Sequence, residues 1–188
     1  MYSQGFDNLS TSGWIQTNLS APAGGSWFQG VPEIFTAKTG ADNSYAGANY
    51  LSAAGGSGTL SNWLISPMIG VGGDRTLVHF SARADFADGF FDTINVYFGS
   101  GSGLNTSAFT LIGSLTVPTD AWTDFSFSIP DVASGRIAFE YAGLADNANY
   151  VGIDDVTVLV PEPASVALVG AALAGLGWAR RTRRSKKR

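Results

Sequence analysis

Apolar and polar residues alternate in a series of short runs between residues 77 and 160, and this period of two constrains the fold more than any other feature. Ile94, Val96 and Phe98 fall on one face of an extended chain, whereas Asn95 and Tyr97 fall on the other. Half-buried strands of this kind are typical of antiparallel sheets. The runs that we predict as strands are Leu77–Ala82, Thr93–Phe98, Phe109–Val117, Thr123–Ile129, Arg136–Tyr141 and Val151–Val160.

Turn residues separate these runs. GSGSG at 99–103 and VGGD at 71–74 are typical of loops, and Pro118 and Pro130 fall at the ends of runs, where proline costs no ladder hydrogen bond. The chain has 24 glycines, and only 14% of its residues are charged. We therefore predict an all-β fold for residues 1–159, an antiparallel two-sheet β-sandwich of the jelly-roll type.

Residues 160–188 have a different character. An apolar run of sixteen residues extends from Ala164 to Ala179, and seven of the chain's eleven Lys and Arg residues follow it. As a helix the run would span about 24 Å, slightly less than the ~30 Å hydrocarbon core of a membrane. A basic cluster stays on the cytoplasmic side, which predicts a short C-terminal transmembrane helix with the body outside the cytoplasm. The basic cluster consists of Arg180, Arg181, Arg183, Arg184, Lys186, Lys187 and Arg188.

The order of these parts resembles the PEP-CTERM sorting signal. The resemblance rests on the tripeptide Pro161-Glu162-Pro163, the Gly/Ala/Leu-rich run and the basic end. It implies an exported protein that resides transiently in the inner membrane through residues 164–179. An exosortase would process it near the tripeptide, and the body would pass to the cell surface or the extracellular matrix. Bacteria with such signals usually make exopolysaccharide. A permanent single-span anchor is the alternative.

Export also requires an N-terminal leader. The chain starts MYSQGFDN, without a basic stretch followed by an apolar one. We therefore expect that a signal peptide was removed or that the start lies further upstream.

The charge of the body excludes one class of partner. Up to residue 159 there are four basic residues against fourteen acidic ones, a net charge of −10, which the basic tail partly hides in the overall value of −4. Nucleic-acid binding requires a basic surface, so we expect no nucleic-acid partner. The chain has no cysteine, so the fold relies on its core or on a metal ion rather than on disulfides.

A second resemblance covers most of the body. It rests on four features, which are Trp27, SNWLISPMI at 61–69, Trp122 followed by Phe-Ser-Phe at 125–127, and GIDDVTV at 152–158. Choice-of-anchor J domains contain these four features in the same order as this chain. Those domains resemble the jelly rolls of cleaved-adhesin and MAM-type proteins. The resemblance implies surface display and names no ligand.

Catalytic signals are weak. The one histidine, His79, lies in a predicted strand, and neither HExxH nor GxSxG occurs. A dispersed Ser-His-Asp set or a carboxylate pair is the alternative, and Glu33 and Glu140 carry no particular signal. We therefore predict no enzyme activity and no catalytic residue.

The second resemblance implies a structural Ca²⁺ ion. Acidic positions of the family fall on Asp7, Asp42 and Asp154. Strict alternation places Asp154 on the face of Val156 and Val158, where a carboxylate needs a protein partner or a metal, although a bulge would change that face. The alternative is that Asp7 and Asp42 are turn or capping residues.

The aromatic residues are mainly core candidates. We expect Trp27, Trp63 and Trp122 to lie in the core, because a sandwich without disulfides depends on large buried side chains. Tryptophans can also form sugar-stacking platforms. Phe90 and Phe91 follow Asp-Gly in a predicted loop, and at least one of them should be exposed. We predict these two as possible glycan contacts.

Together these features predict an exported, non-enzymatic surface or matrix protein with a structural or adhesive role. Its expected partners are an exosortase, the membrane, and exopolysaccharide or surface glycans. A carbohydrate-binding module is the first alternative, and a polysaccharide hydrolase is the second.

Overall fold

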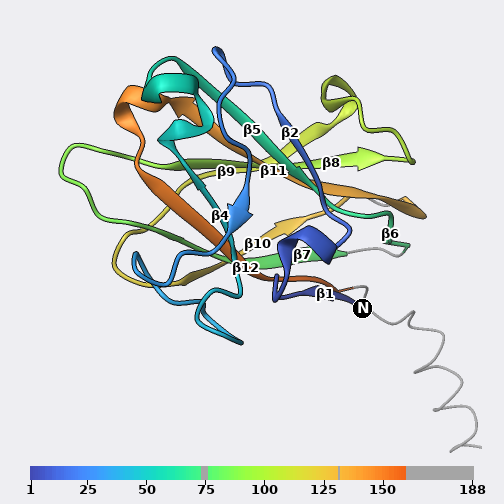
Figure 1. Cartoon of the computed structure of the whole chain (residues 1–188). Coiled ribbons are helices and arrows are strands. Elements are labelled where there is room, and N and C mark those ends of the chain that lie inside the picture. The colour runs from blue at the N-terminus through green and yellow to red at the C-terminus, as the bar shows by residue number, and fades with distance from the viewer. Residues whose placement is uncertain (73–75, 131, 160–188) are drawn as a thin grey trace, which may run out of the picture.

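The chain forms two antiparallel β-sheets in the computed structural model, which describes residues 1–72, 76–130 and 132–159 (Figure 1). In sheet A the strands follow the order β10-β7-β12-β4-β3, and β1 also pairs with β12. Its strands are β1 (Tyr2–Gln4), β3 (Phe28–Gln29), β4 (Ala46–Asn49), β7 (Leu77–Ala84), β10 (Thr123–Ser128) and β12 (Tyr150–Leu159).

Sheet B follows the order β2-β5-β11-β8-β9, and β6 also pairs with β11. Its strands are β2 (Ile15–Asn18), β5 (Thr59–Ile65), β6 (Ile69–Gly70), β8 (Thr93–Ser100), β9 (Thr110–Thr116) and β11 (Ser134–Leu144). Short 3₁₀ helices lie in the connections: η1 (Leu9–Thr11), η2 (Tyr50–Ser52), η3 (Ala54–Gly56), η4 (Thr106–Ala108) and η5 (Ala145–Asn147).

The predicted antiparallel two-sheet sandwich is confirmed, and each of the six predicted runs contains a strand. The prediction missed all six strands of the first 70 residues. Five of them have only two to four residues and are too short to show a period of two. The seven-residue β5 does not alternate regularly, because Trp63, Leu64 and Ile65 are consecutive large apolar residues.

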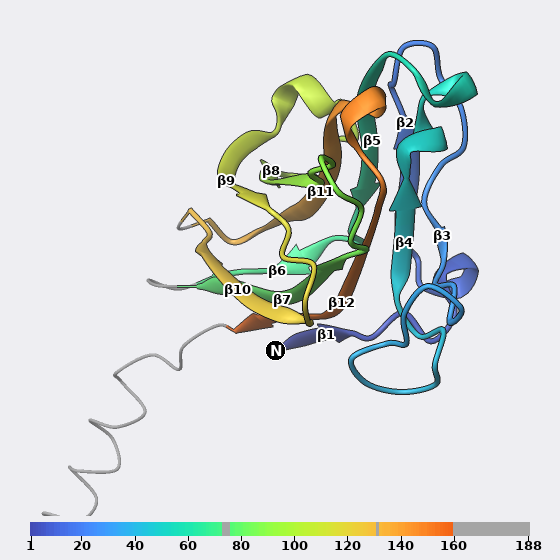
Figure 2. The ribbon, with the colours of Figure 1, turned by 90° about the vertical axis from the view of Figure 1, so that its left-hand side faces the viewer.

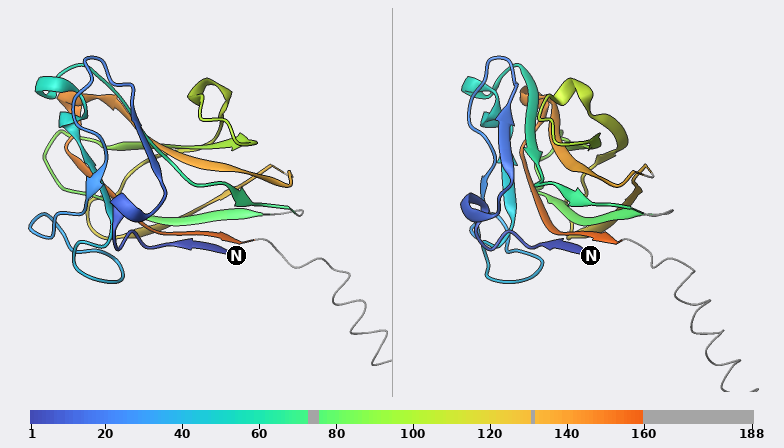
Figure 3. Two further views of the ribbon diagram at one scale, coloured as in Figure 1. Left: turned by 45° about the vertical axis from the view of Figure 1, so that its right-hand side comes forward. Right: turned by 90° about the vertical axis from the view of Figure 1, so that its right-hand side faces the viewer.

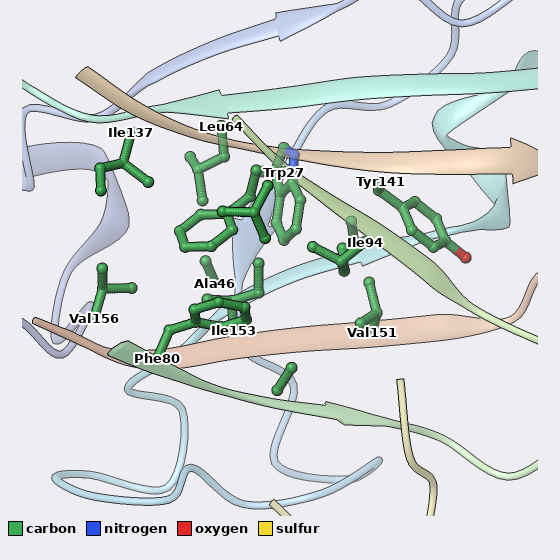
Figure 4. Packing of buried hydrophobic residues seen from close by; sticks show 14 of the residues in the cluster. Trp27, Ala46, Leu64, Phe80, Ile94, Ile137, Tyr141, Val151, Ile153 and Val156 are labelled. Atoms are coloured by element: carbon green, nitrogen blue, oxygen red, sulfur yellow. The ribbon is translucent and has the colours of Figure 1, made fainter. Parts of the chain in front are cut away.

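The main core lies between the two sheets. Figure 2 shows β8, β9 and β11 over β7, β10 and β12. In the close view of Figure 4, Leu64 and Ile137 of sheet B face Phe80 and Ile153 of sheet A, and all four side chains are at most 1% exposed. The predicted inward face of β8 is confirmed, because Ile94, Val96 and Phe98 belong to this core, as do Trp14 and Trp27.

The outer face of sheet A is covered by the segment between β3 and β4. Phe35 of this segment stacks on Tyr45 and meets the rings of Trp122 and Tyr150 edge-on, and it forms a small cluster with them. The guanidinium of Arg83 lies 4.7 Å from the centre of the Phe35 ring. This segment therefore packs on the sheet through its own apolar anchor.

The C-terminal predictions lie outside the described residues. These are the tripeptide Pro161–Pro163, the transmembrane helix predicted for 164–179 and the basic cluster at 180–188. Within the residues that the structure describes, no helix has the length and apolar character needed to cross a membrane.

Candidate functional site

Three connections meet at one end of the sandwich. Backbone hydrogen bonds join them: the Phe91 N–H donates to the Asn147 carbonyl (2.8 Å), the Ala145 N–H to the Gly58 carbonyl (2.8 Å), and the Tyr50 N–H to the Asn149 carbonyl (3.0 Å). The connections are η2 with η3, the loop between β7 and β8, and the turn around η5. In Figure 1 and in the left view of Figure 3 they lie at the end opposite the first residue. These loops are thus held together as one surface.

Large apolar side chains are exposed on this surface. Phe86 is 72% exposed, Phe91 69% and Phe90 41%. Tyr50 is 39% exposed and Leu144 is 55% exposed. The predicted exposure of Phe90 and Phe91 is confirmed, whereas their role as glycan contacts stays a prediction. We call the surface formed by Tyr50, Phe86, Phe90, Phe91 and Leu144 the aromatic end.

The aromatic end contains two hollows that share Phe90. One has a volume of about 400 Å³ and is lined by Tyr50, Asp146 and Asn149 besides Phe90. The other has about 270 Å³ and lies between the loop 86–92 and the residues 117–119. Phe90 is therefore the lining residue that the two hollows have in common.

The aromatic end lies far from the attachment point of the tail. Strand β12 begins at Tyr150, whose carbonyl accepts a hydrogen bond from Asp85 at the aromatic end, and it ends at Leu159. Ten residues of strand span about 30 Å. The long axis of the sandwich therefore separates the exposed aromatic residues from the start of residues 160–188.

A bulge in β12 determines where Asp154 lies. The pairing of β12 with β7 shifts between Asp154 and Thr157, and Asp155 has a positive φ of 51°. Before the bulge Asp154 pairs with Ser81 on the outer face, whereas after it Val156 lies in the main core. The face expected from strict alternation is therefore wrong, because the extra residue exchanges the two faces.

Asp154 is fully buried and is satisfied by the protein. Its Oδ2 accepts hydrogen bonds from the backbone N–H groups of Lys38 (3.0 Å) and Thr39 (3.2 Å), and its Oδ1 accepts one from Asp155 (2.7 Å). Burial raises the pKa of this carboxyl to about 6, and the three N–H donors oppose that shift. Asp154 thus fixes the 38–39 turn to the outer face of sheet A.

The residues fit a calcium ion only in part. Asp7 lies beside Gly40, since a Cβ atom there would stand 3.0 Å from Asp7 Oδ1. The backbone carbonyl of Asp42 accepts from Ala37 in the same segment. Within the described ranges no three His, Cys, Asp or Glu side chains lie close enough together to hold a metal. An ion would need several backbone or amide oxygens, and the N–H partners of Asp154 already explain its burial. Calcium therefore stays a prediction.

A polar group on sheet A involves serine, lysine and aspartate. The Ser81 hydroxyl donates to Asp124 Oδ1 (2.7 Å), and the Lys38 ammonium donates to Ser81 and forms an ion pair with Asp124. These bonds lower the pKa of Asp124, first through the bond from Lys38. His79 lies in β7 as predicted, and its Nε2 has no hydrogen-bond partner among the described residues.

A second buried carboxylate lies on the outer face of sheet B. Glu140 is 8% exposed and accepts hydrogen bonds from Ser61 (2.6 Å), Asn95 (3.0 Å) and Tyr97 (2.9 Å). Burial, and then the bond to Glu140, raises the pKa of Tyr97 to about 12. Sequence reasoning missed this group, because its members come from three strands whose register is not visible in the sequence.

The tryptophans are mostly buried, as expected. Trp27 is 3% exposed in the main core, and Trp63 is 5% exposed. Trp63, however, lies on the outer face of sheet B, where its ring packs on Tyr97 with 4.5 Å between ring centres and its Nε1 donates to Ser61. Trp122 packs against Phe35 and donates to the Thr36 carbonyl. None of these three presents an open ring face comparable to Phe86 or Phe91.

Comparison with solved structures places the sandwich among known folds. The K1 cleaved adhesin domain of Lys-gingipain from Porphyromonas gingivalis W83 is similar with a TM-score of 0.67 and 20% identity, over 85% of this chain and 98% of that chain. The K3 domain of the same protein has a TM-score of 0.65 and 20% identity, over 84% of this chain and 95% of that chain. The CBM22-2 xylan-binding domain from Paenibacillus barcinonensis Xyn10C is more distant, with a TM-score of 0.54 and 13% identity, over 85% and 99%. At these identities the likeness shows the fold alone.

The tail is the part that sequence comparison recognises. Residues 159–184 match the PEP-CTERM protein-sorting motif, and no curated protein matches the sequence. The motif starts where β12 ends, and it implies an exported, surface-sorted protein that an exosortase processes. The chain therefore carries a PEP-CTERM sorting motif at its C-terminus, and its N-terminal domain is structurally like the cleaved-adhesin domains of Lys-gingipain.

Proposed function

We propose that this protein is a non-catalytic, adhesive component of the bacterial surface or extracellular matrix. The observation that carries the proposal is the position of the sorting motif. It begins at Leu159, at the end of the sandwich opposite the aromatic end. Processing there would release or transfer a body whose exposed aromatic residues point away from the point of attachment.

The chemistry of the described residues supports a binding role. Large exposed apolar side chains on one loop surface are typical of interaction sites, and loops on a rigid scaffold commonly carry function. The two polar groups of the outer faces, around Ser81 and Glu140, hold strands and loops together through bonds within the protein. The solved neighbours named above are adhesin and carbohydrate-binding domains, which is consistent with the absence of catalysis.

The matrix assignment is tested in the native host. The processed protein should remain with the cells in a strain that makes exopolysaccharide and appear in the medium of a strain that cannot make it. Immunoblots of the cell-associated and released fractions measure the distribution. An unchanged distribution between the two strains would contradict a role in an exopolysaccharide matrix. A reporter fused to the body before Pro161 that remains in the cytoplasm would contradict export.

A carbohydrate-binding module is the second candidate. It is favoured by Phe90 and Phe91, which are exposed and line a hollow of about 270 Å³, an arrangement that suits stacking against a sugar ring. Glycan-array binding that is lost in Phe90→Ala or Phe91→Ala would support it. The adhesive and carbohydrate-binding functions are compatible when the adhesive contact is itself a glycan.

A further inference from the structure

The aromatic end offers space for more than one sugar ring. Its two hollows, of about 400 Å³ and 270 Å³, both have Phe90 in their lining. Phe90 is 41% exposed, so part of its side chain is accessible to a ligand. The exposed Tyr50 lines the larger hollow, and the exposed Phe86 lines the smaller one. This arrangement suits a chain of linked rings better than a single compact molecule.

The charged residues that line the two hollows are all acidic. Asp146 lines the larger hollow and Asp88 the smaller, and both residues are exposed. Asp146 accepts bonds from Ser57 and the Gly58 N–H, and the Gly58 bond is the first cause that lowers its pKa. Asp146 is therefore ionised at neutral pH.

The described residues that line the two hollows include no lysine or arginine. The basic residues whose side chains the structure describes act elsewhere. Lys38 pairs with Asp124, Arg136 donates to the Ser66 carbonyl, and Arg83 lies over Phe35. An anionic chain such as a polyuronate would therefore meet the exposed Asp88 and Asp146, with the buried Asp92 also lining the smaller hollow, and would find no counter-charge. Like charges repel, so such a chain should be excluded.

Aromatic faces and carboxylates together recognise cations. A carboxylate attracts an ammonium group, and the face of an aromatic ring attracts it as well. The apolar face of a sugar ring stacks on the same aromatic side chain. A sugar chain with free amino groups would satisfy both features of this surface at once.

We propose that the aromatic end binds an oligosaccharide with free amino groups, one ring in each hollow, Phe90 in contact with both, and Asp88 and Asp146 facing the amines. The proposal rests on the carbohydrate-binding candidate above and specifies its ligand class. It also sets the direction of binding, because this surface faces away from Leu159.

Titration calorimetry on the processed protein tests the proposal with three probes: a hexamer of β-1,4-linked glucosamine, its fully N-acetylated counterpart, and a hexauronate. At low salt the glucosamine hexamer should bind about fivefold to tenfold more tightly than the acetylated hexamer, as two partly exposed charge pairs allow. This preference should shrink with added salt. The hexauronate should not bind.

Matched variants assign the effect to residues. Phe90→Ala should weaken both glucosamine-type hexamers, whereas Leu111→Ala, an exposed apolar residue of β9 on sheet B, should not. Asp88→Asn with Asp146→Asn should remove the preference for free amines and keep the binding of the acetylated hexamer. Glu33→Gln, an exposed acidic residue outside both hollows, is the charge control.

Each contrary result overturns a defined part. Equal affinity for the two glucosamine-type hexamers would overturn the amine specificity and leave carbohydrate binding standing. Unchanged binding in Phe90→Ala would overturn the site. Absence of binding to all three probes would overturn the proposed ligand class. The matrix role fails separately, through the distribution of the processed protein in the host.

Discussion

The two ends of the sandwich differ in what their residues do. At one end β12 reaches Leu159 and the sorting motif begins, and β1 and β12 pair next to it. At the other end three loops expose Phe86, Phe90 and Phe91 around two hollows. Between them lies a core whose side chains are almost completely buried. The core therefore determines the stability of the fold, whereas attachment and ligand contact are assigned to opposite ends. Substitutions in these three places should change stability, attachment and ligand binding separately.

The largest effect is expected at the attachment end. Pro161→Ala combined with Pro163→Ala should abolish processing, because it removes the tripeptide on which the sorting motif depends, and the unprocessed protein should accumulate in the membrane fraction. Fractionation and immunoblotting of the native host measure this. The melting temperature of the body should not change, and processing at the wild-type level would show that the tripeptide is dispensable.

The next effect compares the same residue type in the core and at the aromatic end. Phe80→Ala should lower the free energy of unfolding by about 3–5 kcal/mol, because Phe80 is 1% exposed and packs on Phe139. Phe91→Ala should change it by less than about 0.5 kcal/mol, because Phe91 is 69% exposed. Urea unfolding measures both. A large loss in Phe91→Ala would mean that the aromatic end is part of the scaffold.

The third prediction concerns the turn that Asp154 holds. Asp154→Ala leaves the N–H groups of Lys38 and Thr39 without their acceptor, and each such buried donor costs about 1–3 kcal/mol. Removing the desolvated charge offsets part of this, so we expect a net loss of roughly 3 kcal/mol. Asp155→Asn is the control, because the Asp155 side chain accepts from the Thr39 hydroxyl and asparagine tolerates the positive φ of this position. Equal losses in the two variants would contradict the assigned roles.

The fourth prediction is the pH dependence of stability in the presence of chelator. The folded-state pKa of Asp154 is raised to about 6 from 3.8, so between these values the folded state binds more protons than the unfolded state. Its contribution therefore favours folding below pH 4 and is lost as the pH rises to 6, by up to about 3 kcal/mol. Thermal unfolding of the wild-type protein and of Asp154→Ala from pH 4 to 7 measures this contribution as the difference between the two proteins. A rise in stability over that interval that disappears in the variant would contradict it.

The smallest effect tests calcium. An ion that binds only the folded state adds about 2.7 kcal/mol at a hundredfold excess over Kd. For a domain of this size that corresponds to a rise of roughly 4–8 °C or somewhat less in melting temperature. We expect the body to melt lower in chelator than in Ca²⁺, and Asp154→Ala to remove the difference. Identical melting curves, with no metal found by elemental analysis, would reject the ion.

The sequence was most informative where a signal is local. Alternation in β8 identified its buried face, and the tripeptide, apolar run and basic cluster identified the sorting motif without any tertiary information. The loop position of Phe90 and Phe91 after Asp-Gly indicated their exposure.

Prediction failed where one inserted residue or a distant partner decides the geometry. The bulge at Asp155 exchanged the faces of β12, so Asp154 lies under the 38–39 turn rather than beside Val156. Likewise, the bonds from Ser61 and Tyr97 to Glu140 depend on the register of β5, β11 and β8. That register follows from the whole sheet and not from any segment of the sequence.

The intact mass of the protein recovered from the cell surface tests the central claim most directly. We expect a single species that contains the sandwich through Leu159 and lacks the apolar run with Trp178 and the basic cluster up to Arg188. A surface species that retains Trp178 and Arg188 would contradict processing by an exosortase and would show a permanent membrane anchor instead.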